Sequence, residues 1–233
     1  MTEVKLLEIF PCSKRLKIFR FEKPDGFSFK PGQFVMLSND KVLTPANIPL
    51  KRSYSIASSA DADYLEFAIA CGTEKGFSHY LHYEAKQGDK FSLEGPYGNF
   101  NLELPLEKET IFVAGGAGIA PIRSMLYSLS EADFAKGVWL FFGIRSPAEF
   151  LCRTELEALQ SNENFHLIAA VSDYEGDDWE GECGFVCDIF EKHIKSPENK
   201  QIFLCGPPIM IETTVEKAKS IGFPEEQIHF EKW

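Results

Sequence analysis

The chain has 233 residues, of which 44% are hydrophobic and 25% charged, so its composition excludes disordered, collagen-like and coiled-coil proteins. No apolar run approaches the roughly 20 residues that a membrane-spanning helix needs. The N-terminal residues also lack the layout of a secretory signal, which indicates a cytoplasmic protein. A net charge of −11 argues against nonspecific binding to nucleic acid or to an anionic membrane.

The six cysteines are scattered along the chain rather than clustered. Only Cys183 and Cys187 lie close together, and no further cysteine or histidine stands beside them. Zinc sites and iron–sulfur clusters normally need four clustered ligands. The sequence therefore predicts reduced thiols and no metal site.

The first hundred residues contain short apolar segments that are separated by turn residues such as Gly, Pro and Asp. Many short strands with turns at fairly even spacing are typical of an antiparallel barrel or sandwich. Clear examples of these segments are Leu16–Phe21, Phe34–Leu37, Tyr54–Ala57, Leu65–Ala70 and Lys90–Leu93.

From residue 110 onward, continuous apolar strands alternate with helical patterns, which predicts a doubly wound α/β domain with a parallel sheet. We place the boundary at residue 104, so the two domains are 1–104 and 105–233. The predicted strands are Thr110–Ala114, Val138–Phe142, His166–Val171, Gln201–Cys205 and Gln227–Glu231. The predicted helices are Pro121–Ser130, Pro147–Gln160, Val186–Ile194 and Pro208–Ile221.

A glycine-rich loop containing Gly116 and Gly118 follows the first strand of the second domain, and Pro121 opens the next helix. Glycines let the backbone approach a pyrophosphate, and a helix N-terminus offers free N–H groups. The loop reads Gly-x-Gly-x-x-Pro rather than the Gly-x-Gly-x-x-Gly of a dinucleotide fingerprint, so a tight turn without a ligand is the alternative. Its place between the first strand and first helix favours nucleotide binding.

The fourth strand of this domain ends at Cys205, followed by Gly206, Pro207 and Pro208. Ligands of such sheets bind at the carboxyl ends of the strands, where the glycine loop also lies. A buried core cysteine is the plainer interpretation of Cys205. The Gly-Pro-Pro that follows favours a site residue, because Gly206 would let a ligand come close.

Two segments of the first domain could also bind a ligand. Arg52 and Tyr54 lie on one side of a predicted strand, where an arginine can pair with a phosphate while a ring stacks on a planar ligand. A surface strand with an exposed arginine is the alternative. Further on, Gly76-Phe77-Ser78 could open a helix whose N-terminus binds a second anion.

Six segments, in this order, make the sequence resemble the ferredoxin–NADP reductase family of flavoproteins over nearly the whole chain. The resemblance implies an N-terminal antiparallel FAD-binding β-barrel, followed by a doubly wound nicotinamide-nucleotide domain with the redox site between them. The segments are Arg52-Ser53-Tyr54-Ser55, Gly76-Phe77-Ser78, Gly95-Pro96-Tyr97-Gly98, Gly116 to Pro121, Cys205 to Pro208 and Glu231-Lys232-Trp233.

The resemblance also implies roles for individual residues. Arg52 would contact a flavin phosphate, Tyr54 would lie against the flavin, and Ser55 would hydrogen-bond near N5. Cys205 would sit beside the nicotinamide C4, and Glu231 would relay a proton to Ser55. Trp233 would cover the flavin ring and move when nicotinamide stacks there. The remaining implied cofactor-binding residues are Ser53, Gly76, Phe77 and Ser78 for the flavin, and Gly116, Gly118, Pro121, Gly206 and Pro207 for the nucleotide.

The implied reaction is hydride transfer from nicotinamide C4 to flavin N5, with FAD favoured over FMN. Relatives that use NADPH usually carry Ser-Arg after the third strand of the nucleotide domain, whereas this chain has Ser172-Asp173. A carboxylate would repel a 2′-phosphate, so we expect NADH. Arg145 or Arg153 could instead restore NADPH binding.

The implied acceptor is a separate small redox protein, either a ferredoxin, a flavodoxin or an oxygenase component. A chain of charge −11 would repel an acidic acceptor unless a cluster such as Lys14, Arg15, Lys17 and Arg20 faces it; a solvated face is the plainer interpretation of that cluster. Three other functions stay open. They are an NAD(P)H:flavin reductase that uses free flavin, an electron-transfer subunit of a larger complex, and a nucleotide-binding regulatory module without flavin.

Overall fold

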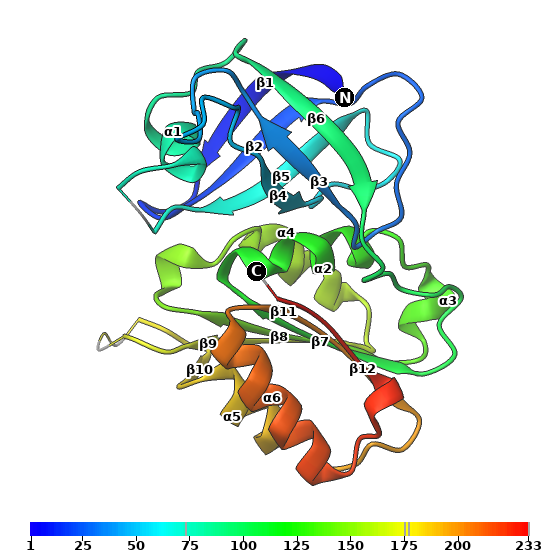
Figure 1. Cartoon of the computed structure of the whole chain (residues 1–233). Coiled ribbons are helices and arrows are strands. Elements are labelled where there is room, and N and C mark those ends of the chain that lie inside the picture. Colours follow the sequence, from blue (N-terminus) through cyan, green and yellow to red (C-terminus); the bar gives the residue numbers. More distant parts are fainter. Residues whose placement is uncertain (73, 175, 177, 233) are drawn as a thin grey trace.

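Six antiparallel strands form the first half of the molecule, as the short apolar segments predicted (Figure 1). Their order is β4-β3-β6-β1-β2-β5. The Ala57 N–H donates to the carbonyl oxygen of Glu66 at 2.8 Å, so the chain beyond β4 joins β5 and helps to close the barrel. The strands are β1 (Thr2–Pro11), β2 (Leu16–Glu22), β3 (Phe34–Ser38), β4 (Arg52–Ser55), β5 (Tyr64–Ala70) and β6 (Lys90–Tyr97).

This computed structural model describes residues 1–72, 74–174, 176 and 178–232. The barrel interior is filled largely by phenylalanine rings that alternate along the strands, such as Phe19 and Phe21 on β2. Helix α1 (Phe77–Tyr83) contributes Phe77 to the same core, where it meets Phe91 edge-on with ring centroids 6.1 Å apart. The barrel therefore has a hydrophobic core of its own.

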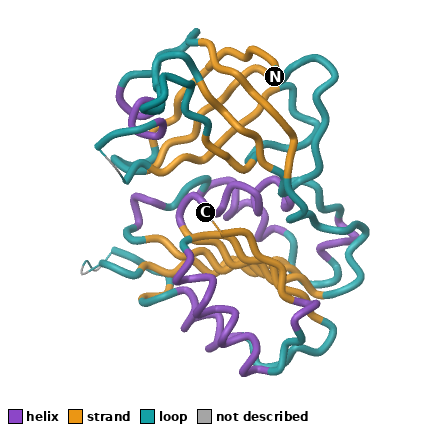
Figure 2. Tube along the Cα trace, viewed as in Figure 1, coloured by secondary structure: helices purple, strands orange, loops and turns teal. Residues whose placement is uncertain are grey.

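The second half is a parallel sheet of six strands in the order β10-β9-β8-β7-β11-β12, with helices on both faces (Figures 1 and 2). This arrangement is the doubly wound domain that the alternation of strands and helices predicted. Its strands are β7 (Glu109–Gly115), β8 (Val138–Ile144), β9 (Phe165–Val171), β10 (Glu182–Cys183), β11 (Lys200–Gly206) and β12 (Ile228–Lys232). Its helices are α2 (Ile119–Leu126), α3 (Glu131–Phe134), α4 (Arg153–Ala158), α5 (Val186–His193) and α6 (Pro208–Ile221).

Strand β7 shows how this sheet buries both of its faces. Ile111 and Val113 pack in the cluster that contains residues of α5 and α6. Phe112 and Ala114 point to the other face, into a cluster that also takes in Ala57 and Ala68 of the barrel. This second cluster therefore gives the contact between the two halves an apolar core. The boundary that we place at residue 104 lies in the connection between β6 and β7.

The segment from 147 to 160, which the sequence predicted as one helix, is divided in the structure. A 3-10 turn (Pro147–Glu149) comes first, α4 begins only at Arg153, and a second 3-10 turn follows it. Cys152 between them has a φ of 57°, a left-handed conformation that no continuous right-handed helix can contain. Among the described residues, no helix is both long and apolar enough to cross a membrane.

Candidate active site

The glycine loop of the second half lies at the carboxyl end of β7, as predicted. Gly116–Gly118 form a 3-10 turn that leads directly into α2. A Cβ atom on Gly118 would overlap the carbonyl oxygen of Cys205, so only glycine permits this close approach of the loop to β11. Gly116 has a φ of 52°, and a Cβ atom added there would meet nothing within 4 Å, so the space beside it is open to a ligand.

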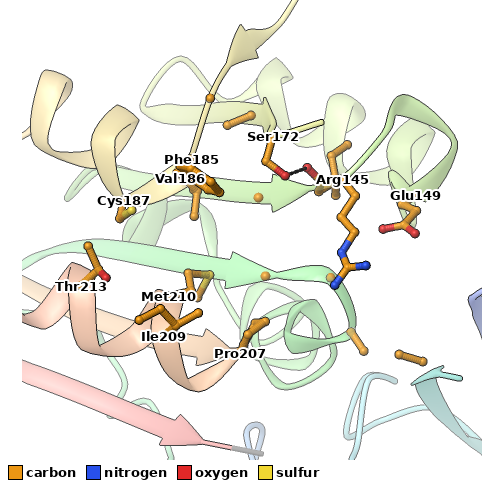
Figure 3. A pocket seen from close by; sticks show the side chains of 18 of the residues that line it. Arg145, Glu149, Ser172, Phe185, Val186, Cys187, Pro207, Ile209, Met210 and Thr213 are labelled. Carbon is orange, nitrogen blue, oxygen red and sulfur yellow. Dashed lines mark hydrogen bonds between the residues drawn. The ribbon is translucent and has the colours of Figure 1, made fainter. Parts of the chain in front are cut away.

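A cavity of 460 Å³ opens at this edge of the parallel sheet (Figure 3). Gly116 and Pro207, both predicted as nucleotide-binding residues, line it together with Gly115. Gly206 lies behind the lining, where a Cβ would stand 3.0 Å from the backbone nitrogen of Gly115. The glycine loop and the end of β11 thus meet beside one cavity, at the edge where doubly wound folds bind ligands.

Two exposed apolar side chains of this cavity were missed by the sequence analysis. Phe185 is 66% exposed and Ile209 is 71% exposed, and both line the cavity. In Figure 3, Phe185 lies on one side of the cavity and Ile209 on the other, while Arg145 extends between the two sides at one end. The available signal was their position, because each stands at the start of a helix that follows a strand end.

A barrel residue also reaches this cavity. Arg15, from the turn between β1 and β2, lines it together with Glu149. Their charged atoms, Nη1 of Arg15 and Oε1 of Glu149, are 3.7 Å apart. The cavity is therefore built by both halves of the molecule.

A second cavity, of 260 Å³, lies between the barrel and the sheet, and the motif of β4 forms part of its wall. Ser53, Tyr54 and Ser55 line it, as does Glu231 of β12. The Ser55 hydroxyl donates a hydrogen bond to Oε2 of Glu231 at 3.1 Å. The structure thus joins the serine and the carboxylate that the sequence analysis paired.

Glu231 lies in an environment that favours its protonated form. Burial raises the pKa of this carboxyl above its ordinary value of 4.5, and the hydrogen bond from Ser55 opposes only part of that effect. Backbone comes close on one side, since a Cβ on Gly98 would stand 3.8 Å from Oε1 of Glu231. A buried carboxyl hydrogen-bonded to a hydroxyl can hold and exchange a proton inside the cavity.

The two cavities share a wall of small side chains. Ala70, at the end of β5, and Ala117, in the glycine loop, line both of them. Ala68 and Ala120 extend this wall along the smaller cavity. Ala70 and Ala117 therefore mark the place where the two cavities adjoin and where ligands in them would meet.

The residues predicted to hold the flavin phosphates differ in their exposure to solvent. Arg52 is exposed, and its guanidinium donates to the carbonyl oxygen of Lys51 at 2.9 Å. Gly76 is the N-cap of α1 and has a φ of 96°, and Ser78 is half-buried in the first turn. Phe77 is 1% exposed and packs near Tyr54, with ring centroids 6.2 Å apart. Its side chain belongs to the barrel core, so any contact of Phe77 with a cofactor would come from its backbone, and that role stays a prediction.

Other predicted site residues lie behind the cavities. Cys205 is fully buried in the core beside the barrel and lines neither cavity, so its direct role at nicotinamide stays a prediction. Pro121 is buried within the first turn of α2, behind the glycine loop. Trp233 lies outside the described residues. Within the part of the chain that is described, no three histidine, cysteine or acidic side chains are grouped as metal ligands.

Comparison with protein families matches both halves separately. Residues 3–102 match the model of the oxidoreductase FAD-binding domain, and residues 112–216 match that of the oxidoreductase NAD-binding domain. The reductase component of propane 2-monooxygenase from Mycolicibacterium smegmatis is 30% identical over 100% of this chain and 67% of its own length. The chain belongs to the ferredoxin–NAD(P) reductase family.

Another member, ferredoxin–NADP reductase B of Sorangium cellulosum, is 29% identical over 99% of this chain and 97% of its own. A solved ferredoxin–NADP reductase from Neisseria gonorrhoeae, with bound FAD and NADP, has the same fold. It superposes with a TM-score of 0.86 at 24% identity, over 99% of this chain and 98% of that chain. The chain spans 62% to 67% of the length of the first curated relatives it matches. The chain thus consists of one half that matches an FAD-binding domain and one half that matches an NAD-binding domain of oxidoreductases.

Proposed function

We propose that the chain takes electrons from a nicotinamide coenzyme in the larger cavity and passes them, through FAD in the smaller one, to a separate redox protein of the cytoplasm. The observation that carries this proposal is that Ala70 and Ala117 line both cavities, so the two cavities adjoin and their ligands can come into contact there. When bound, FAD supplies the redox chemistry, since it accepts a hydride and releases electrons singly or in pairs.

The residues around the smaller cavity fit a flavin ring. Alanines on β5 and in the glycine loop leave room for a flat ring, and Ser55 offers a hydroxyl at its edge. In this proposal Ser55 would hydrogen-bond the ring near N5. Because the hydride itself supplies the hydrogen at N5, Glu231 would take up, through the serine hydroxyl, the proton that N5 releases when the flavin is reoxidised. Arg52 and the backbone of Gly76 and Ser78 would hold the phosphates, because all three are at least partly open to solvent.

We favour NADH over NADPH as the electron donor. Asp173 follows β9 beside the larger cavity and is exposed, and its N–H donates to the carbonyl oxygen of Arg145 at 3.1 Å. A carboxylate there would repel a 2′-phosphate and accept a hydrogen bond from a free ribose hydroxyl. Arg145 lines the cavity, and its positive charge would favour the opposite choice, NADPH.

The structure weakens the case for a basic docking cluster on the barrel. Arg20 binds Glu66 at 2.8 Å, and Lys17 donates to the carbonyl oxygen of His82 at 2.7 Å. Arg15 faces Glu149 in the nucleotide cavity. Three of the four basic side chains are thus engaged within the molecule, so we assign them no role in binding the acceptor.

An anaerobic titration of the purified protein with NADH, followed by its visible spectrum, tests the proposal. Bound flavin that bleaches with NADH is the expected result. Flavin that bleaches only with NADPH would show that Asp173 does not decide the coenzyme. A colourless protein that reduces added flavin would establish the flavin-reductase alternative instead. Bound flavin that neither coenzyme reduces would contradict the proposal.

A further inference from the structure

A buried group of charged side chains links the two halves beside the smaller cavity, which the proposed function assigns to the flavin and which we call the flavin cavity. Arg123 of α2 is 8% exposed, and Glu66 of β5 is 3% exposed. Nη1 of Arg123 donates to Oε2 of Glu66 at 2.6 Å, across the junction between helix and barrel. Arg123 also donates from Nε and Nη2 to the two carboxylate oxygens of Glu155 on α4, each at 2.9 Å. Such a bidentate ion pair fixes the plane of the guanidinium as well as its position.

The same helix is tied to the chain that follows β4. Nη1 of Arg123 donates to the carbonyl oxygen of Ala57 at 3.2 Å. The hydroxyl of Ser124 donates to the carbonyl oxygen of Ser58 at 2.8 Å. Because Ala57 stands only two residues beyond Ser55, α2 is bonded to both barrel segments that form the flavin cavity.

These bonds lie in line with the alanine wall between the two cavities. Glu66, Ala68 and Ala70 alternate along β5 and so point to one face of the strand. Ala120 and Arg123 are three residues apart on α2 and so share one face of the helix. On both elements the alanines line the flavin cavity and the charged residue lies beyond them. Figure 1 shows α2 and α4 between the barrel and the parallel sheet.

We propose that Arg123 is a positioning residue, whose bonds to Glu66 and Glu155 hold the nucleotide-binding half against the flavin-binding barrel and so set how nicotinamide and flavin meet. This inference rests on the proposed function, because it concerns the transfer between those two ligands. Transfer between held reactants is steep in their separation, and misplacement by about 1 Å can cost about a hundredfold in rate. Helix α2 is well placed to set the position of the nucleotide, because it begins directly after the glycine loop.

Arg20 provides a matched control within the same group of charges. Its Nε and Nη2 donate to Oε1 of Glu66 at 3.0 and 2.8 Å, so each oxygen of Glu66 has its own arginine. Arg20 lies on β2 and thus bonds Glu66 within the barrel. Replacing either arginine removes one cation from Glu66, but only the loss of Arg123 also removes the bonds that join α2 to the barrel at Glu66 and Ala57.

The test compares Arg123→Gln, Arg123→Lys and Arg20→Gln in rapid-mixing reduction of the FAD-loaded protein by NADH. For Arg123→Gln we expect the limiting rate of flavin reduction to fall by about ten- to a hundredfold, while the NADH dissociation constant changes by less than about twofold. The long-wavelength charge-transfer absorbance of stacked nicotinamide and flavin should weaken in parallel. Arg123→Lys, which keeps a cation opposite Glu66, should recover part of both. Arg20→Gln should match the wild type.

Amide hydrogen exchange of the FAD-free protein gives a second measurement that does not depend on activity. Arg123→Gln should speed exchange in both β5 and α2, whereas Arg20→Gln should affect the barrel alone. Equal rates and absorbance in Arg123→Gln and wild type would overturn the proposal, as would equal losses in the two glutamine variants. If Arg123→Gln does not fold, Arg123→Lys alone provides the test. A wild-type rate of flavin reduction together with wild-type amide exchange in Arg123→Lys would contradict a positioning role for Arg123. A wild type that NADH and NADPH both fail to reduce would contradict the proposed function and leave the exchange test standing.

Discussion

Ser55 and Glu231 are 176 residues apart in the chain, yet their side chains form a hydrogen bond in the cavity between the two halves. Strand β4 presents the hydroxyl and β12 presents the carboxyl, so the pair exists only when the barrel and the sheet are docked. The burial that raises the pKa of Glu231 arises from the same docking. The chemistry of this pair therefore depends on the junction as much as on the two residues.

Removing the hydroxyl of Ser55 tests the proposed hydrogen bond between this serine and the flavin ring near N5. Ser55→Ala should retain FAD, because the alanine keeps the shape of the wall, and should slow flavin reduction by about a hundredfold. Rapid mixing with NADH under anaerobic conditions measures the rate. Ser53→Ala, on the same strand and cavity wall, is the control and should change the rate far less. Equal rates in Ser55→Ala and wild type would remove Ser55 from the mechanism.

The raised pKa of Glu231 predicts a pH dependence with a definite sign. The folded state favours the protonated carboxyl, so the free energy of unfolding should decline as the pH rises through the raised pKa. Any step in which Glu231 takes up a proton needs the unprotonated carboxyl and should speed up over the same interval, which begins above the ordinary value of 4.5. Glu231→Gln should abolish both trends. Chemical unfolding and turnover measured across pH 4 to 9 would show them, and a variant with unchanged pH profiles would refute the assignment.

For individual residues, the sequence was informative where a residue type in a motif points to one chemical role. The serine of β4 and the carboxylate near the chain end were paired by resemblance, and the structure brings them together. The sequence did not show that the side chain of Phe77 packs in the barrel core, because a motif does not say which way a side chain points. It also missed Arg123, since the value of a buried arginine depends on partners 57 and 32 residues away.

Among the elements, the turn between β7 and α2 makes different demands on its two glycines. Gly118→Ala should abolish nucleotide binding and destabilise the sheet, because its Cβ would overlap the backbone of Cys205. Gly116→Ala should cost only about 1–2 kcal/mol, since its left-handed backbone is strained for alanine but the space beside it is open. Thermal unfolding and NADH titration of the two variants would separate these effects. Comparable losses in both would show that the close approach to β11 is unimportant.

Helices were predicted well where the pattern alone decides them. The bounds expected for α6, Pro208–Ile221, are those observed, since a double proline opens it and Gly222 in a left-handed conformation ends it. The segment around Cys152 was predicted wrongly as a continuous helix. The left-handed Cys152 packs against a cluster that contains barrel and α2 residues, and hydrophobic periodicity carries no record of such contacts.

For the molecule as a whole, the net charge of −11 governs how it meets an acceptor. Reduction of a basic protein such as cytochrome c should slow by about tenfold as ionic strength rises from about 0.02 to about 0.5 M, because screening removes the attraction. Reduction of the anion ferricyanide should accelerate over the same range. Steady-state assays with both acceptors provide the comparison. The same trend for both would mean that a local patch, rather than the overall charge, controls the encounter.

The alanine wall at Ala70 and Ala117 also bears on inhibition. Because the two cavities adjoin there, one elongated compound with a planar head and a nucleotide-like tail would fill both together. Joining two weak binders in this way raises affinity through effective concentration, without any new contact. Such a compound would compete with flavin and coenzyme at once. Replacing either alanine by a larger residue would separate the two cavities. The compound would then occupy only one of them and compete with one ligand alone.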